Sequence, residues 1–224
     1  LLMDVDGDEY ADLIAQALPE LIWLEATNKE GTEWRSQVIG NIPKTSHTNS
    51  QGFERGQLIA GGKEEFVIAG NGNIYLVELP LEPTKEVWPI TLVAENTSDE
   101  GIGVGDIDGD GDMDLAAGRR PEGGDEPLIL VWYENTGQAE VWSPTVIGKS
   151  NHPLDRVEIM DLNGDRKADI IIAEERYPGK EPDGSLFWFA QGENPKAENW
   201  AKNREVTQYS MNNLDIADID EDGD

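Results

Sequence analysis

The chain has 224 residues, of which 46 are acidic and 17 are basic, and its net charge is −29. This charge argues against nucleic acid as a partner, because phosphates require a Lys/Arg surface, and against binding to an anionic membrane surface. It suits a protein that binds cations. Seven Trp residues argue against disorder. No apolar run reaches the roughly 18 residues of a membrane span, so we expect no membrane insertion.

An acidic nine-residue pattern recurs along the chain with a period near 55 residues. It reads DVDGDEYAD from Asp4, DIDGDGDMD from Asp106 and DLNGDRKAD from Asp161, and the last copy, DIDEDGD, begins at Asp218. Recurrence at a fixed period indicates a repeat architecture. The repeat divides the chain into units of approximately 1–56, 57–105, 106–160 and 161–217, with the start of a fifth at 218–224.

The gap between the first two acidic copies is about twice the period, which predicts a further copy near residue 57. The stretch GQLIAGGKEEFVIAG from Gly56 fits this place. It keeps the apolar frame of the other copies but carries Gln57, Ile59, Gly61 and Glu65 at their acidic positions. We therefore expect this copy to bind no ion.

The aromatic residues follow the same period. After each loop comes an aromatic strand and, 10 to 13 residues later, a Trp; the pairs are Trp23 with Trp34, Tyr75 with Trp88, Trp132 with Trp142, and Trp188 with Trp200. No Trp is left over. Most of these rings are expected in the core, where they bury a large area; stacking on a sugar is the alternative for any one of them.

Each unit reads as four short strands. An apolar stretch precedes the loop, and three β-rich runs follow it, such as DLAAG, LILVWYEN and WSPTVIG. Val, Ile, Trp and Tyr punctuated by Gly, Pro and Asn are strand signals. The stretch YADLIAQALPELIW has some helical character, but its counterparts in the other units are strands, so we predict strand. The fold class predicted is all-β, with four-stranded antiparallel units of the kind that form β-propeller blades.

The acidic loop is typical of a cation site. Side chains at positions 1, 3 and 5 of a tight loop, here Asp106, Asp108 and Asp110, converge on one point, and Gly at position 4 permits the turn. A carbonyl at position 7 and Asp114 at position 9 can complete a shell of oxygen ligands, which suits Ca²⁺ better than Zn²⁺ or Mg²⁺.

Two other kinds of acidic loop have a similar composition. An EF-hand needs a Glu at position 12 and flanking helices, whereas position 12 is Ala15, Ala117 or Ile172 and the flanks are predicted strands. An Asp-rich turn without metal stays open as the alternative, since Asp and Gly favour turns on their own.

The stretch GDIDGDGDMDLAAG, followed by LVWYENTG and WSPTVIG, resembles the FG-GAP/VCBS-type repeat of calcium-binding β-propellers, seen in integrin α-chain head domains and in secreted bacterial proteins. The resemblance covers the whole chain and implies that the loop joins the first two strands of each blade. It implies three complete calcium sites and a truncated fourth. These are Asp4, Asp6, Asp8 and Asp12 with the Tyr10 carbonyl; Asp106, Asp108, Asp110 and Asp114 with the Asp112 carbonyl; Asp161, Asn163, Asp165 and Asp169 with the Lys167 carbonyl; and Asp218, Asp220 and Asp222.

Propellers of this type usually close with about seven blades. About four are visible here, and both ends of the sequence fall at the same phase of the repeat, so we expect a part of a larger ring. The alternative is that exposed edge strands pair with a neighbouring molecule, which would give self-association into an end-to-end polymer.

We expect a binding partner to be recognised by the loops at the face opposite the calcium loops. Three are long and polar: 41–55, 119–127 and 175–184. Their candidate residues for an acidic or sugar partner are His47, Arg55, Arg119, Arg120, Arg176 and Tyr177. Solvated loops without a role are the alternative.

Signatures of catalysis are weak, because the sequence has no Ser elbow, HExxH pattern or Cys nucleophile, and its two His, His47 and His152, lie in predicted loops. The favoured function is therefore a non-catalytic, calcium-stabilised module that recognises carbohydrate or extracellular protein. The alternatives are a calcium-dependent polysaccharide lyase and a structural subunit of an extracellular assembly. Calcium affinities near 0.1 to 1 mM are typical of extracellular modules, which favours a secreted or cell-surface location.

Overall fold

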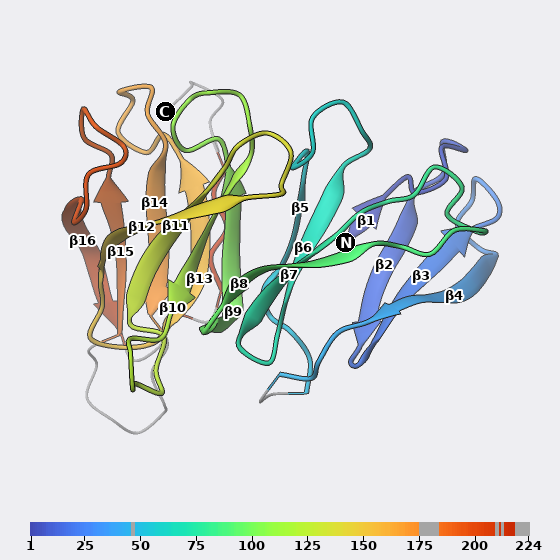
Figure 1. Ribbon diagram of the computed structural model, residues 1–224, viewed down its shortest axis with the longest axis horizontal. Coiled ribbons are helices and arrows are strands. Elements are labelled where there is room, and N and C mark those ends of the chain that lie inside the picture. The colour runs from blue at the N-terminus through green and yellow to red at the C-terminus, as the bar shows by residue number, and fades with distance from the viewer. Residues whose placement is uncertain (46–47, 175–183, 209–210, 212, 218–224) are drawn as a thin grey trace.

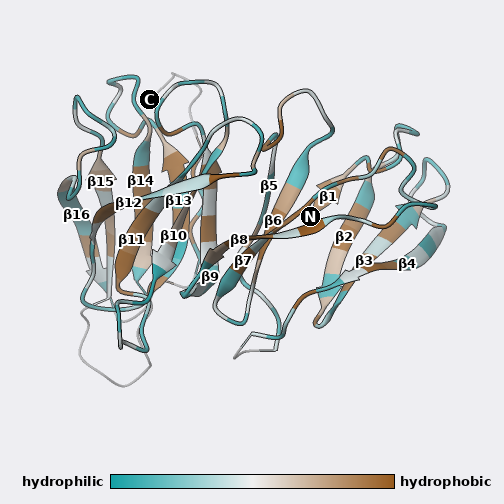
Figure 2. Cartoon of the chain, in the orientation of Figure 1, coloured by the Kyte–Doolittle hydropathy of each residue, from teal (hydrophilic) through white to brown (hydrophobic). Residues whose placement is uncertain are grey.

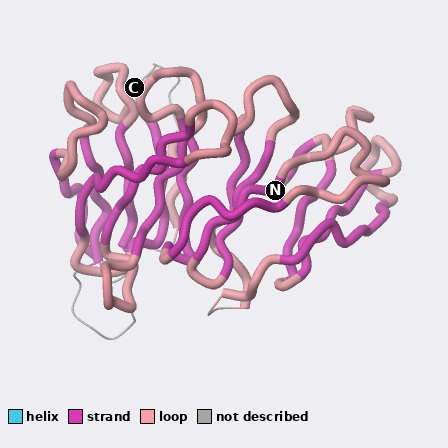
Figure 3. The backbone as a smooth tube through the Cα atoms, in the orientation of Figure 1, coloured by secondary structure: helices cyan, strands magenta, loops and turns pink. Residues whose placement is uncertain are grey.

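The computed structural model describes residues 1–45, 48–174, 184–208, 211 and 213–217. These residues form strands, turns and loops (Figure 3), so the all-β prediction is confirmed. The stretch 10–23, with its ambiguous pattern, contains a strand hairpin, as predicted. The described part of the chain contains no helix with the length and apolar character needed to cross a membrane.

The strands form four antiparallel four-stranded sheets (Figure 1), each a meander in which strands consecutive in the chain are neighbours. The first sheet contains β1 (Leu2–Met3), β2 (Asp12–Ala17), β3 (Glu20–Ala26) and β4 (Trp34–Asn41). The second contains β5 (Phe53–Gly56), β6 (Glu65–Gly70), β7 (Asn73–Val77) and β8 (Ile90–Glu95). The third contains β9 (Thr97–Gly105), β10 (Asp114–Arg119), β11 (Ile129–Asn135) and β12 (Trp142–Lys149). The fourth contains β13 (Leu154–Met160), β14 (Asp169–Glu174), β15 (Gly184–Ala190) and β16 (Ala201–Gln208).

The sheets pack face to face along the chain, with three apolar clusters between them. Strand β6 shows the pattern: all six of its residues are buried, because Phe66 and Ile68 join the cluster with the first sheet while Val67 and Ala69 join the cluster with the third. Alternation of side chains along a strand places these two sets on opposite faces. Figure 2 shows many of the hydrophobic residues, in brown, along the strands.

The aromatic residues have two different roles. Trp23 and Trp132 are completely buried, and Trp23 packs on Trp88 of the next sheet with ring centroids 6.1 Å apart. The second Trp of each unit donates its indole N–H to a carbonyl of the turn before the fourth strand; the pairs are Trp34 with Gly31, Trp88 with Pro83, Trp142 with Ala139, and Trp200 with Pro195. Trp34 is 43% exposed. The prediction that most Trp rings lie in the core holds for Trp23, Trp88, Trp132 and Trp200.

The first strands of successive sheets lie next to one another. A Cβ atom on Gly101 of β9 would lie 2.5 Å from the Asp155 carbonyl oxygen and 2.7 Å from the Cα atom of Arg156, both on β13. Gly52, at the matching position before β5, is similarly close to the Glu100 carbonyl. Glycine therefore permits these backbones to approach one another.

Candidate functional site

The acidic loops join the first and second strands of their sheets, at one end of the strands (Figure 1). In the third sheet, Asp106 at position 1 closes the loop: its two carboxylate oxygens accept hydrogen bonds from the backbone N–H of Gly109 (2.8 Å) and of Gly111 (3.1 Å). Asp4 and Asp161 accept the equivalent pairs of bonds in the first and third acidic copies.

The turn requires a left-handed backbone at two positions. Gly109 at position 4 has φ 77° and Gly111 at position 6 has φ 98°. Glycine at position 4 agrees with the sequence prediction. Position 6 is also left-handed in the other two copies, where it is Glu9 and Arg166, with φ 71° and 69°. This second position could not be predicted from the sequence, because its residue type varies between the copies.

Position 9 is a buried clip. Asp114 is fully buried and opens β10; one carboxylate oxygen accepts from the backbone N–H of Ile107 at position 2 (3.0 Å), and the other accepts from the N–H of Asn135 at the end of β11 (2.8 Å). Asp12 and Asp169 form the same pair of bonds in their sheets. The position-9 carboxylate therefore fixes the loop to the third strand of its own sheet.

Two groups of carboxylates could hold a metal ion. Asp4, Asp6 and Asp8 form the first, and Asp106, Asp108 and Asp114 form the second. In each group, one oxygen of each residue lies within 4.8 Å of the others. These two groups contain six of the residues that the sequence marked as ligands.

Asp108, in the second group, has a buried oxygen without a donor, its Oδ1 atom. Burial, followed by the charges of Asp110 and Glu134, raises the pKa of Asp108. Burial also raises the pKa of Asp114 to about 7. A buried carboxylate oxygen without a donor is costly, and a cation at this place would offset that cost.

The remaining predicted ligands are placed differently. Asp12 and Asp110 lie outside the two groups, and Asp161, Asp165 and Asp169 do not form such a group among the described residues. In this third copy the position-3 residue, Asn163, accepts from the N–H of Asp165 (2.9 Å). Position 7 contributes a backbone N–H: Tyr10, Asp112 and Lys167 donate to the carboxylates of Asp8, Asp110 and Asp165. Asp218, Asp220 and Asp222 lie outside the described residues.

Loop 57–65 is organised without a carboxylate at positions 1, 3 and 5. The side-chain amide of Gln57 donates to the carbonyl oxygens of Ile59 (2.7 Å) and Lys63 (3.3 Å), so an N–H donor satisfies the position-7 carbonyl. Glu65 keeps only the loop half of the position-9 clip: it is buried, and its Oε2 accepts from the N–H groups of Leu58 and Ile59, both in the loop. The prediction from the sequence counted Glu65 among the lost ligands and did not identify this role.

The loops also connect neighbouring sheets. In three loops, the carbonyl oxygen at position 2 accepts a side-chain hydrogen bond from the next sheet. The pairs are Lys63 Nζ with Val5 (2.5 Å), Asn135 Nδ2 with Leu58 (2.7 Å) and Gln191 Nε2 with Ile107 (2.5 Å). We call these three bonds the inter-sheet latches.

Loop 119–127 lies at the opposite end of the strands, as predicted, because it connects the end of β10 to the start of β11. Arg119 and Arg120 line a cavity there. Arg55 was expected on this face and is not: it lies two residues before an acidic-type loop, donates to the Leu2 carbonyl (2.8 Å) and pairs with Glu64 (3.2 Å). The other candidates for recognition, His47, Arg176 and Tyr177, lie outside the described residues.

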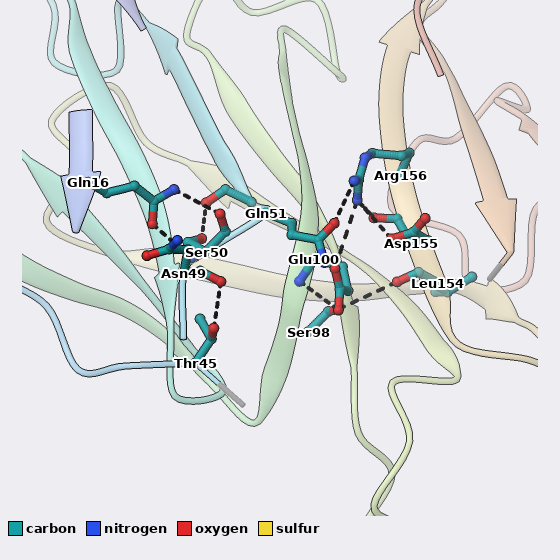
Figure 4. Close-up of polar contacts among 11 residues, drawn as sticks. Gln16, Thr45, Asn49, Ser50, Gln51, Ser98, Glu100, Leu154, Asp155 and Arg156 are labelled. Carbon is teal, nitrogen blue, oxygen red and sulfur yellow. Dashed lines mark hydrogen bonds and ion pairs between the residues drawn. The ribbon is translucent and has the colours of Figure 1, made fainter. Parts of the chain in front are cut away.

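A polar cluster that the sequence prediction missed lies near the start of the first strands (Figure 4). Arg156 donates to Asp155 (2.7 Å) and to Gln51 (2.7 Å), and its guanidinium is 3.9 Å from Glu100. Gln51, Glu100 and Asp155 each stand six residues before position 1 of their loops. Their shared position in the repeat could have been recognised from the sequence.

Comparisons with known proteins assign no family to this arrangement. No protein-family model matches the chain, and no curated protein matches it.

Proposed function

We propose that the chain is a calcium-stabilised recognition module of the β-propeller type, which acts outside the cell or at its surface and binds carbohydrate or protein. The buried, unpartnered Oδ1 of Asp108, beside Asp106 and Asp114, carries the proposal. The propeller arrangement is supported by four successive meander sheets that pack face to face with their first strands adjacent.

The donor set fits calcium. The side chains of both groups supply carboxylate oxygens only, and hard oxygen ligands favour Ca²⁺, whereas Zn²⁺ takes nitrogen and sulfur. Asp4, Asp6 and Asp8 would hold one ion; Asp106, Asp108 and Asp114 would hold another. A bound ion would supply positive charge where burial and like charges raise the pKa of Asp108 and of Asp6.

We assign recognition to the face with loop 119–127. The acidic loops at the other end are held in place by the position-9 carboxylates and by the inter-sheet latches, so their polar groups already have structural partners. Surface loops at the end of a rigid scaffold commonly carry binding residues. Fixing the sheets at one end would keep the loops at the opposite end in a constant arrangement.

Calcium titration tests the scaffold. Isothermal titration calorimetry should detect Ca²⁺ binding, and the melting midpoint should rise from chelator to millimolar Ca²⁺; a hundredfold excess over Kd adds about 2.7 kcal/mol per site. In Asp108→Asn, most of the calcium-dependent rise in melting midpoint that comes from this site should be lost. Asp125→Asn, which changes an exposed carboxylate in the loop between β10 and β11, is the matched control. A midpoint insensitive to Ca²⁺, with no heat of binding, would remove the proposal.

A further inference from the structure

We propose that the cavity beside Arg119 binds the carboxylate of an acidic sugar, a hexuronic acid presented as a monosaccharide or a short oligosaccharide. The inference rests on the proposed function and names the ligand class and the site. Three observations carry it: a braced cavity, a guanidinium without a partner, and a lining that matches hydroxyl groups as well as one carboxylate.

The cavity has a volume of about 610 Å³ and lies between residues 95–96, loop 119–124 and the start of β11. This volume is within the usual range for small-molecule sites, about 300 to 1,000 Å³. Arg119 is the last residue of β10 and pairs in register with Thr97 of β9 and Ile129 of β11. Its backbone is thus held by strands on both sides.

The Arg119 side chain forms no hydrogen bond or ion pair with any residue that the structure describes, although it is partly buried. Arg166 and Arg204 also have no such partner among the described residues, but both are exposed, whereas Arg119 lines the cavity. Arg35, Arg55 and Arg156 each have a carboxylate partner. A guanidinium presents a planar fork of donors that matches a carboxylate, so Arg119 offers one site for one such group.

Arg120 has a different role, although it is adjacent in sequence. Its Nε donates to the Asp125 carbonyl (3.0 Å), and its Nη1 donates to the Thr97 carbonyl. These bonds brace loop 120–125 against the start of β9. The cavity wall is therefore preformed, and a ligand would not have to order it, which lowers the entropic cost of binding.

The remaining lining favours a sugar over an acidic peptide. Glu95, Glu122 and Asn96 line the cavity with Arg119. Carboxylates accept hydrogen bonds from hydroxyl groups, whereas they repel additional carboxylates. The net charge of −29 acts in the same direction against polyanions. A ligand with one carboxylate and several hydroxyls fits this combination.

Titration with glucuronic and galacturonic acid tests the site on the full chain in millimolar Ca²⁺. Binding should be saturable, and Arg119→Ala should weaken it about tenfold or more, because a charge-assisted pair is lost. Arg119→Lys, which keeps the charge but loses the fork, should retain part of the affinity. Arg35→Ala, an exposed arginine on the first sheet, should bind as the wild type does.

Neutral sugars of the same shape show how much of the affinity comes from the carboxylate. Glucose and galactose should bind at least tenfold more weakly than the uronic acids. Equal binding of neutral sugars, preferential binding of a triglutamate peptide, or an unchanged affinity in Arg119→Ala would overturn the inference. No uronate binding by protein that is still stabilised by Ca²⁺ would refute this site alone, whereas a chain without any Ca²⁺ response would refute the proposed function.

Discussion

The side-chain amide of Asn135 donates a 2.7 Å hydrogen bond to the carbonyl oxygen of Leu58, which belongs to the loop of the preceding sheet. The same amide donates to Met113 of its own loop (3.0 Å), and its oxygen accepts from the N–H groups of Gly137 and Ala139. Asn135 is fully buried. It therefore satisfies backbone groups from two sheets at once.

Replacing Asn135 with Leu should destabilise the protein by about 3 to 5 kcal/mol, because buried carbonyl and N–H groups would lose their partners, each at a cost of about 1–3 kcal/mol. Chemical denaturation measures the change. Asn151→Leu, at an exposed position in the same sheet region, should alter the free energy of unfolding by less than about 0.5 kcal/mol. Similar effects of the two substitutions would show that the latch contributes little.

Loop 57–65, which we expect to bind no ion, gives a second prediction. Gln57 donates to the carbonyls of Ile59 and Lys63, a role that needs no ion. Gln57→Ala should destabilise the protein by about 1 to 2 kcal/mol, equally in Ca²⁺ and in chelator. Asp106→Ala should cost more in Ca²⁺ than in chelator. Melting curves of both variants under both conditions decide the matter, and a calcium-dependent effect of Gln57→Ala would contradict the assignment of this loop.

The repeat made the strands and loops predictable. Apolar alternation and turn residues identified the sheets, including the hairpin at residues 12–26, because the copies constrain one another. Asp at positions 1, 3, 5 and 9 was visible as a pattern. Two of the three complete copies bring three carboxylates together, while Asn163 occupies position 3 in the copy that does not.

The partners of individual side chains were not predictable. Asp114 looked like one ligand among several, yet its burial and its two backbone hydrogen bonds depend on where β11 ends. Arg119 and Arg120 are neighbours of the same type, and only the fold shows that Arg120 braces a loop while Arg119 faces a cavity. Such roles depend on distances between segments far apart in sequence, which composition and spacing do not contain.

The close approach of the first strands gives a third prediction. A Cβ on Gly101 would meet three backbone atoms of β13 at 2.5 to 2.8 Å, and backbone cannot move aside as a flexible side chain can. Gly101→Ala should therefore destabilise the protein by about 1–3 kcal/mol. Gly192→Ala is the control, because its Cβ would have nothing within 4 Å. Equal stability of the two variants would show that β9 and β13 are not packed this closely.

The last prediction concerns pH and Glu158 on β13. Burial, followed by the charges of Glu54 on β5 and Asp215, raises the pKa of Glu158 from 4.5 to about 7. The folded protein thus binds this proton more tightly than the unfolded chain does, so its contribution to the free energy of unfolding falls as pH rises from about 4.5 to about 7.

Glu158→Gln keeps the shape of the side chain and removes its ionisation. The variant should match the wild type below pH 4.5 and should melt at a higher temperature above pH 7, where the wild-type carboxylate is charged. Melting midpoints of both proteins between pH 4 and 8 in calcium-free buffer measure the difference, with the exposed Glu30→Gln as control. Parallel midpoint curves for the wild type and Glu158→Gln would mean that Glu158 is well solvated in the folded protein, and that the like charges of Glu54 and Asp215 are too distant to affect it.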